Sequence, residues 1–223
     1  MRLPIVGGRL RGRWWDPTSR GKVLRILNGT YEREQTALFE QLIRPGHTVL
    51  DVGANIGYYT LLAAVLVGPK GAVHAFEPEP RNAGFLRRHV EMNRLRKVTV
   101  QQAAVSDRAG TARFDFGSGS GTGRLADSGA IEVRTLRLDD YCAEHGLAPS
   151  AIKIDVEGAE MSVLQGARQT LERHRPVLFL STHGAEVHRA CLAFLRGLGY
   201  GVRPILGGDV ETTSEVLATP GGA

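Results

Sequence analysis

Residues 49–60 read VLDVGANIGYYT, an apolar run that enters a turn with two glycines and then a helical pattern. Gly53 permits a sharp turn because glycine tolerates left-handed backbone angles, and Gly57 is expected to let the helix start close against a ligand. Ligands of open α/β sheets bind beyond the carboxyl ends of the strands, which is where this turn stands. The stretch therefore predicts a nucleotide-binding turn after the first main strand of an α/β sheet.

The residues of this turn discriminate between nucleotides. The dinucleotide fingerprint G-x-G-x-x-G rests a pyrophosphate on the helix start, but here Asn55 stands where the second glycine belongs. No GK[ST] follows the turn, which excludes a P-loop. Asp51 adds an acid, which suits an ammonium group better than a pyrophosphate. A ligand with a cationic amino-acid end and a ribose fits these features, and S-adenosylmethionine is such a ligand.

The next strand pattern, HAFEPEP, contains an acid at the spacing that ribose binding requires. Glu77 follows Gly57 by about twenty residues, where a carboxylate accepts both ribose hydroxyls and disfavours a 2′-phosphate. Taken alone, the glycine turn could be only a turn and Glu77 an acid at a helix start. Their order and spacing together favour cofactor binding.

Strand-like and helical patterns alternate along most of the chain, which predicts a mostly parallel sheet with helices on both faces. An amphipathic helix is expected over residues 31–43. Strands are expected at 48–52, 71–77, 98–105, 151–156 and 176–182. Helices are expected at 57–67, 80–93, 159–173 and 185–197. Only the stretch after residue 105 breaks the rule, because it carries β-alternating pieces and the Gly/Ser-rich loop 116–129, which has the freedom of a lid or of a disordered loop.

The composition is that of a soluble globular protein. The 223 residues are 42% hydrophobic and 23% charged, without an apolar run as long as a membrane span. The N-terminus lacks the apolar core of a signal peptide, and the two cysteines form neither a disulfide framework nor a zinc pattern. We therefore expect a cytoplasmic protein.

Basic residues gather in the first part of the chain, and the net charge is +5. Residues 1–28 are read as a basic N-terminal segment, followed by a single domain over 29–223. Arginines beside Trp14 and Trp15 are typical of a nucleic-acid arm, in which arginine neutralises phosphate and tryptophan stacks on bases. They are equally typical of a segment that packs its tryptophans on the domain, and packing is the favoured interpretation.

Six segments in unbroken order carry a family resemblance. They are GTYEREQTALF (29–39), VLDVGANIGYYTLLAA (49–64), GAVHAFEPEPRN (71–82), VQQAAVSDRAGTARF (100–114), VRTLRLDDY (133–141) and IKIDVEGAEMSVLQGA (152–167). Over roughly residues 29–200 the chain resembles class I S-adenosylmethionine-dependent methyltransferases of the FkbM family. The resemblance implies a Rossmann-like α/β fold with a seven-stranded sheet and one antiparallel strand, for which 199–206 and 214–220 are the candidates for the last hairpin. It also implies O-methylation of hydroxyls on sugars or natural-product scaffolds.

The resemblance assigns cofactor contacts residue by residue. Those implied at the methionine end of S-adenosylmethionine are Asp51, Gly53, Asn55 and Gly57. Glu77 would hold the ribose, and Asp155 would face the sulfonium. Those implied beside the adenine are Ala104, Val105 and Ser106. Tyr58 and Tyr59 begin the helix after the turn; one of them, taken as Tyr58, is expected to pack on the cofactor and the other to belong to the core. The chain departs from the I-E-x-H pattern of many relatives, because Ser181 and Thr182 precede His183.

Proton removal from a hydroxyl acceptor needs a base, and candidates lie at the ends of two strands. His183 ranks first because histidine titrates nearest to the working pH, with Asp155 and Glu157 as its catalytic companions and Glu160 close by. His183 could instead cap the strand end.

Lys153, Asp155 and Glu157 are expected on one side of an extended strand. Lys153 is read as the partner of a carboxylate in an ion pair, with a desolvated lysine base as the alternative. The acids and His183 could bind Mg²⁺, but their spacing does not require it, and no metal site is predicted.

Three functions remain open at this stage. The favoured one is a small-molecule O-methyltransferase whose acceptor is a sugar or secondary metabolite. An RNA methyltransferase that uses the basic N-terminal segment is the second. The third is a module that binds S-adenosylmethionine without catalysis, although Asp51, Glu77 and Asp155 are all present.

Overall fold

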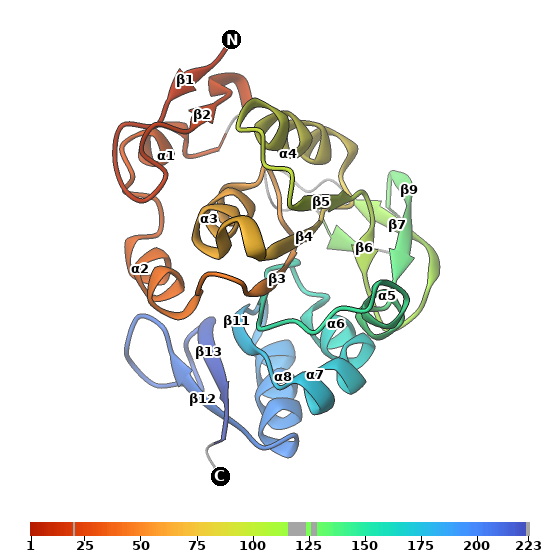
Figure 1. Cartoon of the computed structure of the whole chain (residues 1–223). Helices are drawn as coiled ribbons and strands as arrows, with labels where there is room; N and C mark the ends of the chain where they lie inside the picture. The colour runs from red at the N-terminus through yellow and green to blue at the C-terminus, as the bar shows by residue number, and fades with distance from the viewer. Residues whose placement is uncertain (20, 116–123, 126–128, 222–223) are drawn as a thin grey trace.

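A computed structural model describes residues 1–19, 21–115, 124–125 and 129–221. Within these ranges, the main sheet has seven strands in the order β12-β13-β11-β10-β3-β4-β5 (Figure 1). The strands are β3 (Thr48–Val52), β4 (Ala72–Phe76), β5 (Val98–Gln101), β10 (Ala151–Ile154), β11 (Val177–Ser181), β12 (Tyr200–Pro204) and β13 (Glu215–Pro220). β13 runs antiparallel to both β11 and β12, whereas the pairings among β5, β4, β3, β10 and β11 are parallel. The predicted sheet, with one antiparallel strand in the last hairpin, is confirmed.

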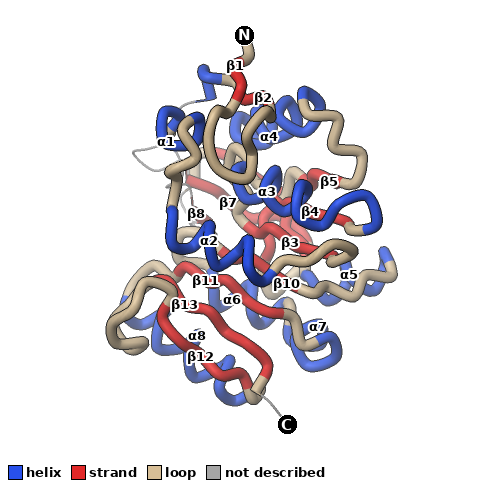
Figure 2. The backbone as a smooth tube through the Cα atoms, turned by 60° about the vertical axis from the view of Figure 1, so that its left-hand side comes forward, coloured by secondary structure: helices blue, strands red, loops and turns tan. Residues whose placement is uncertain are grey.

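Helices cover both faces of this sheet because its strands are apolar on both sides. Leu50 and Ile152 face the core that α5 to α8 cover, whereas the neighbouring Val49 and Ala151 face the core under α2 and α3. Figure 2 shows the strands between the two helical layers. The α-helices are α1 (Val23–Leu27), α2 (Arg33–Leu42), α3 (Tyr58–Val67), α4 (Pro80–Met92), α5 (Leu138–His145), α6 (Glu160–Gly166), α7 (Arg168–His174) and α8 (Ala185–Gly197). Short 3-10 turns lie at Pro17–Ser19 and Gly68–Lys70.

Two predicted elements are each divided in the structure. The strand expected over 98–105 breaks after β5, and β6 (Ala104–Val105) joins a second sheet with β9 (Ile131–Leu136), β7 (Gly110–Asp115) and β8 (Arg124–Leu125). The helix expected over 159–173 breaks at Ala167 between α6 and α7. Asp139 causes the second break, because its carboxylate accepts the amide hydrogens of Gln169 and Thr170 and so caps a new helix start. Most of the proposed lid over 116–129 lies outside the described residues.

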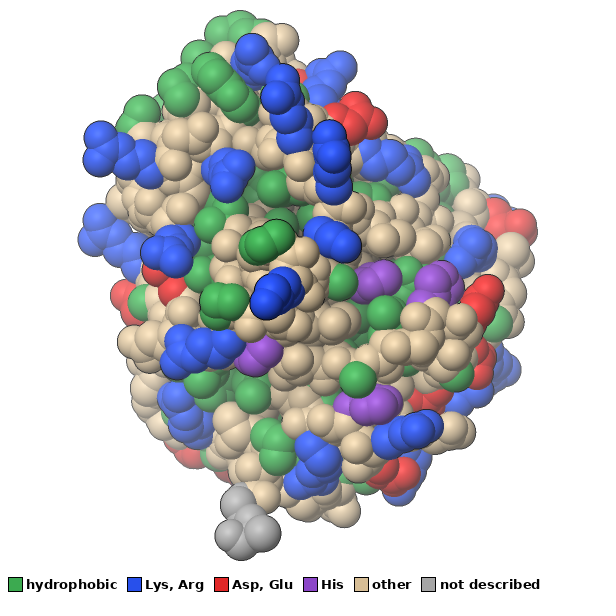
Figure 3. Space-filling view, viewed as in Figure 1, with side chains coloured by type: hydrophobic (Ala, Val, Ile, Leu, Met, Phe, Trp, Pro, Cys, Tyr) green, Lys and Arg blue, Asp and Glu red, His purple; other side chains and the backbone are tan. Residues whose placement is uncertain are grey.

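The N-terminal segment packs on the domain, as favoured. It carries β1 (Leu3–Pro4), β2 (Trp14–Trp15) and α1. Trp15 is fully buried, and its ring stacks on His89 of α4 with 3.8 Å between ring centroids. Asp16 pairs with Arg88 at 2.6 Å. In Figure 3 lysine and arginine side chains spread over this face, several of them at the top near the N-terminal segment. Trp15 is therefore part of the core and is not exposed for stacking on bases.

Candidate active site

The turn between β3 and α3 is a tight left-handed curl. Gly53, Asn55 and Gly57 have φ angles of 79°, 51° and 97°. Asparagine is one of the few side chains that tolerate this region, which explains why Asn55 can replace a glycine. The amide N–H groups of residues 53 to 57 all have acceptors within the protein. A curl with no spare N–H group is a poor phosphate cradle, so the geometry agrees with the exclusion of a pyrophosphate ligand.

Both glycines of the turn have positive φ angles, and packing against backbone also requires a glycine at position 53. A Cβ at Gly53 would lie 1.8 Å from the backbone oxygen of Asp155, so only a glycine at this position lets the turn contact the loop after β10. A Cβ at Gly57 would lie 2.4 Å from Leu86 of α4. The neighbour that a side chain at Gly57 would meet is Leu86, and the expected close approach of Gly57 to a ligand stays a prediction. Gly57 still lines the larger of two adjoining cavities.

The smaller cavity is a cleft at the carboxyl ends of β4 and β6, and Glu77 forms part of its wall. Glu77 is 5% exposed, with one oxygen accepting the Asn55 N–H (2.8 Å) and the other the Glu79 N–H (2.9 Å). Burial raises the pKa of Glu77 to about 7, although both hydrogen bonds oppose this shift. Ala104 and Val105 line the same cleft. This arrangement offers a carboxylate and an apolar wall, which suit a ribose and a base.

Ser106 is the one predicted cofactor residue that lines neither cavity. Its hydroxyl donates to Asp107 and its amide to the backbone oxygen of Leu136. The wall is completed by residues that the sequence analysis missed, which are Phe76, Pro78, Glu79, Asn82, Ala103, Phe114, Val156 and Ala159. They come from separate segments that only the fold brings together.

The larger cavity has a volume of about 630 Å³ and lies between the carboxyl ends of β3, β10 and β11 and the N-terminal segment. Asp51 and Tyr58 line it, as do Lys22 and Glu32, which the sequence analysis did not single out. Asp51 is 1% exposed, and its Oδ2 accepts the Thr60 hydroxyl at 2.5 Å. Its Oδ1 has no hydrogen-bond partner among the described residues, so a buried acceptor remains available for an ammonium group.

Lys153 is held in an ion pair, as interpreted. It stands beside Asp51 in the register of β10 and β3, and its Nζ lies 3.2 Å from Asp155 Oδ2. Burial alone would lower the pKa of Lys153, but the carboxylates of Asp155 and Asp51 reverse the direction and raise it. Lys153 is therefore kept protonated, and the alternative of a neutral lysine base is not supported. The prediction that Glu157 shares one side of an extended strand with Lys153 and Asp155 is wrong. β10 ends at Ile154, and Glu157 has a left-handed φ of 54°.

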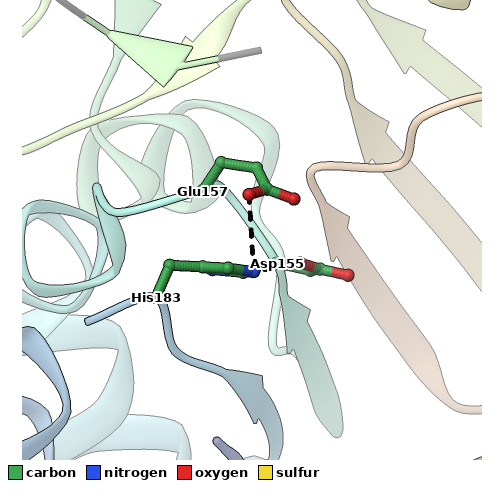
Figure 4. Close-up of side chains that lie close together, drawn as sticks. All are labelled: Asp155, Glu157 and His183. Carbon is green, nitrogen blue, oxygen red and sulfur yellow. Dashed lines mark ion pairs between the residues drawn. The ribbon is translucent and has the colours of Figure 1, made fainter. Parts of the chain in front are cut away.

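His183 lies beside Asp155 and Glu157 at the rim of the larger cavity (Figure 4), and a third carboxylate, Glu160, contacts its other ring nitrogen. Its Nδ1 lies 2.7 Å from Oε1 of the fully buried Glu160. Its Nε2 faces Glu157 Oε2 at 3.5 Å and Asp155 Oδ1 at 3.8 Å. The hydrogen bond to Glu160, followed by the charge of Glu157, raises the pKa of His183 against the opposing effect of partial burial. Burial raises the pKa of Glu157.

The arrangement of these groups fits S-adenosylmethionine. The two cavities share Gly53, Asn55, Asp155 and Glu157, so a nucleoside in the cleft would extend an amino-acid end toward Asp51 and a sulfonium toward Asp155. Asp155, Glu157 and His183 also offer ligand atoms within 4.8 Å of one another, a spacing compatible with a metal ion. No helix among the described residues is long and apolar enough to cross a bilayer.

Comparisons with known proteins agree with this geometry. A family model described as the Methyltransferase FkbM domain matches residues 51–202. The chain is 35% identical over 202 residues to the 31-O-demethyl-FK506 methyltransferase FkbM of Streptomyces tacrolimicus, covering 72% of this chain and 75% of that protein. It is 32% identical over 155 residues to the 2-O-methyltransferase NoeI of Sinorhizobium fredii, covering 60% of this chain and 63% of that protein.

A solved structure shares the fold. The methyltransferase FkbM from Methylobacillus flagellatus KT superimposes with a TM-score of 0.57 at 19% identity, over 88% of this chain and 52% of that one. The extent of the family match, the sheet order and the adjoining cavities point to the same conclusion. The chain belongs to the FkbM methyltransferase family and has the class I methyltransferase fold, for which S-adenosylmethionine is the implied cofactor.

Proposed function

We propose that this protein is an S-adenosylmethionine-dependent O-methyltransferase that acts on a hydroxyl of a small molecule, either a sugar or a natural-product scaffold. One observation carries the proposal. Asp155 and Glu157 stand at the junction of the cleft beside Glu77 and the larger cavity, and His183 opens onto the larger cavity at the same point. FkbM and NoeI, whose names describe a methylated natural product and a 2-O-methyl transfer, support the class of acceptor.

The cofactor contacts are proposed on the same basis. Glu77 would bind the ribose, Ala104 and Val105 would flank the adenine, and Asp51 would accept the ammonium group. The curl containing Gly53, Asn55 and Gly57 would contact the methionine end, with Tyr58 beside it. S-adenosylmethionine supplies an electrophilic methyl group on a positively charged sulfur.

His183 would act as the general base. Its Nε2 would take the proton of the acceptor hydroxyl, whose oxygen would form a bond to the methyl group that S-adenosylmethionine supplies, with the neutral demethylated cofactor as the leaving group. Asp155 and Glu157 then face the positive imidazolium. Alignment of acceptor and methyl group supplies much of the acceleration, and proton removal contributes about 10² to 10⁴-fold.

Metal ions are not required in this proposal, because Lys153 already balances Asp155 and His183 faces Glu157. Treatment with EDTA should leave the methyl-transfer rate unchanged. A loss of rate that Mg²⁺ or Mn²⁺ restores would contradict this and would make Asp155, Glu157 and His183 the ligand set.

The proposal includes a cytoplasmic protein of secondary metabolism. Cys142 and Cys191 are both free and buried, as expected for a reducing compartment. The acceptor is proposed to be a small molecule and not a nucleic acid, since Trp15 is committed to the core.

Calorimetry and a transfer assay test the function. The protein should bind S-adenosylmethionine and its demethylated product but not NAD. It should then transfer radiolabelled methyl from the cofactor to members of a panel of sugars and glycosylated natural products. Tight NAD binding without S-adenosylmethionine binding would overturn the proposal. Methyl transfer to RNA, with the steep salt dependence of phosphate contacts, would favour the rival acceptor class.

A further inference from the structure

Glu160 is a buried acid that the proposed reaction has not yet used. It is the first residue of α6, it is 0% exposed, and its Oε1 lies 2.7 Å from His183 Nδ1. We propose that Glu160 is a positioning residue that fixes the tautomer of His183, so that Nδ1 carries the hydrogen and Nε2 presents its lone pair to the acceptor hydroxyl. This inference rests on the proposed function, because it assigns His183 the role of base.

The hydrogen bonds of Glu160 assign the direction of the contact. Oε1 already accepts the amide hydrogen of Gly158 at 2.9 Å, so this oxygen faces Nδ1 as an acceptor. Carboxylates accept and do not donate, and the imidazole must therefore donate from Nδ1. Nε2 is left pointing at the space beside Asp155 and Glu157, at the junction of the two cavities.

The backbone around His183 holds the ring in this position. Thr182 donates its amide hydrogen to Ser214 in the loop before β13, and its hydroxyl pairs with His188 of α8 at 2.8 Å. Gly184 then turns the chain into α8 with a φ of 102°. His183 is thus anchored on both sides, and Glu160 supplies the contact that sets the orientation of the ring.

Burial of Glu160 is hard to explain by structure alone. Its Oε2 has no hydrogen-bond partner among the described residues, and a buried oxygen left unsatisfied lowers the stability of the fold. A partly exposed Glu160 side chain could accept the Gly158 amide hydrogen equally well, so this contact alone does not require burial. Glu186 shows the ordinary alternative, since it is an acid in the first turn of α8 and is exposed. A buried carboxylate is useful where a cation forms during the reaction, and His183 becomes one when it takes the proton.

Nuclear magnetic resonance of the histidine nitrogens tests the proposal in the free protein, whether or not an acceptor is known. The neutral form of His183 should carry its hydrogen on Nδ1, and Glu160→Gln should lower the pKa of His183 and mix the tautomers. Wild-type protein with the hydrogen on Nε2 would overturn the proposal even if the variant failed to fold. An unchanged pKa and tautomer in folded Glu160→Gln would overturn it as well.

Kinetics separate positioning from a purely structural role. Glu160→Gln should lower kcat by between about tenfold and 10⁴-fold, the upper value being typical of a catalytic histidine that loses its supporting carboxylate. Acceptor KM and cofactor affinity should stay near native, and the rising limb of the pH–rate profile should move to lower pH. Glu186→Gln is the matched control and should change none of these. If wild-type protein transferred no methyl group, the proposed function would fail, while the resonance measurement would still decide the tautomer.

Discussion

Glu77 holds two backbone amides and is also proposed to bind the ribose of the cofactor, so a test must separate these two roles. Each oxygen accepts one backbone amide hydrogen and keeps a further lone pair for a ribose hydroxyl. Glu77→Ala should weaken binding of S-adenosylmethionine by roughly 1.5 to 3 kcal/mol, the scale of charge-assisted hydrogen bonds. Because burial raises the pKa of Glu77 to about 7, wild-type affinity should also fall as the pH drops below that value. Calorimetry against pH measures both effects, and unchanged affinity in the variant would make Glu77 structural.

His183→Ala tests proton removal at a single residue. The variant should fold, bind S-adenosylmethionine with near-native affinity, and lose about 10² to 10⁴ in turnover. Since the hydrogen bond to Glu160 raises the pKa of His183, the wild-type rate should rise with pH, with its midpoint shifted upward from that of an ordinary histidine. Stopped-time assays across pH should show that limb in the wild type and not in the variant. Full activity would redirect the search to Asp155 and Glu157, and a loss of cofactor binding would mean that His183 builds the pocket.

Among the elements, the turn after β3 and the loop after β10 depend on one another. Gly53 touches the backbone oxygen of Asp155 where a Cβ would lie 1.8 Å away, and its φ is 79°. Gly53→Ala should therefore displace the loop that carries Asp155 and Glu157, weakening cofactor binding and lowering thermal stability. Gly84→Ala in α4 is a matched control, because nothing lies within 4 Å of its Cβ position. It should be neutral or stabilise the protein by up to about 1 kcal/mol, the cost of glycine in a helix. Equal effects of the two changes would contradict the argument.

Most elements of the fold can be predicted from local pattern, and the failures have local causes as well. β3 and α8 match their predicted ranges because apolar runs and glycine boundaries mark both ends. The stretch 98–105 has a continuous strand composition, but nothing in it shows that β6 pairs with β9 instead of continuing in the main sheet. The break between α6 and α7 depends on Asp139, about thirty residues away, and periodicity cannot report such a contact.

At the scale of the whole molecule, the site residues that can be predicted from the sequence are those at or near the carboxyl ends of strands. Asp51 lies near the carboxyl end of β3, and Glu77, Asp155 and His183 follow other strands, so parallel topology brings all four to one edge of the sheet. Lys22 and Glu32 lack such a signal, and they reach the larger cavity because the N-terminal segment and the start of α2 both lie beside it. The sequence identifies Glu160 only as an acid near the candidate bases, because its burial and its contact with His183 appear only in the folded structure.

The attachment of the N-terminal segment should make the stability of the whole molecule sensitive to acid. His89 Nε2 accepts the amide hydrogen of Asp16 at 3.0 Å, so Nδ1 carries the hydrogen that the Ile56 oxygen accepts at 2.7 Å. Burial lowers the pKa of His89 to about 4, and the positive charge of Arg88 acts in the same direction. The hydrogen bond to Ile56 and the charge of Asp16 act in the opposite direction. A folded-state pKa below the unfolded value of 6.5 means that neutral His89 stabilises the fold fully above pH 6.5. That contribution, about 3 kcal/mol, is lost as the pH falls from 6.5 toward 4.

Protonation of His89 would remove the acceptor that holds Asp16 and place a cation against the Trp15 ring in the core. Thermal unfolding followed from pH 7.5 to 4.5 should therefore show a falling Tm, and the tryptophan fluorescence of the N-terminal segment should change with it. His47 and His74 also have lowered pKa values and add to the same slope, so the difference between wild type and His89→Gln isolates the effect. The variant should be less stable at pH 7.5 and should lose less stability on acidification. Parallel pH profiles for the two proteins would show that His89 does not control how the segment is held.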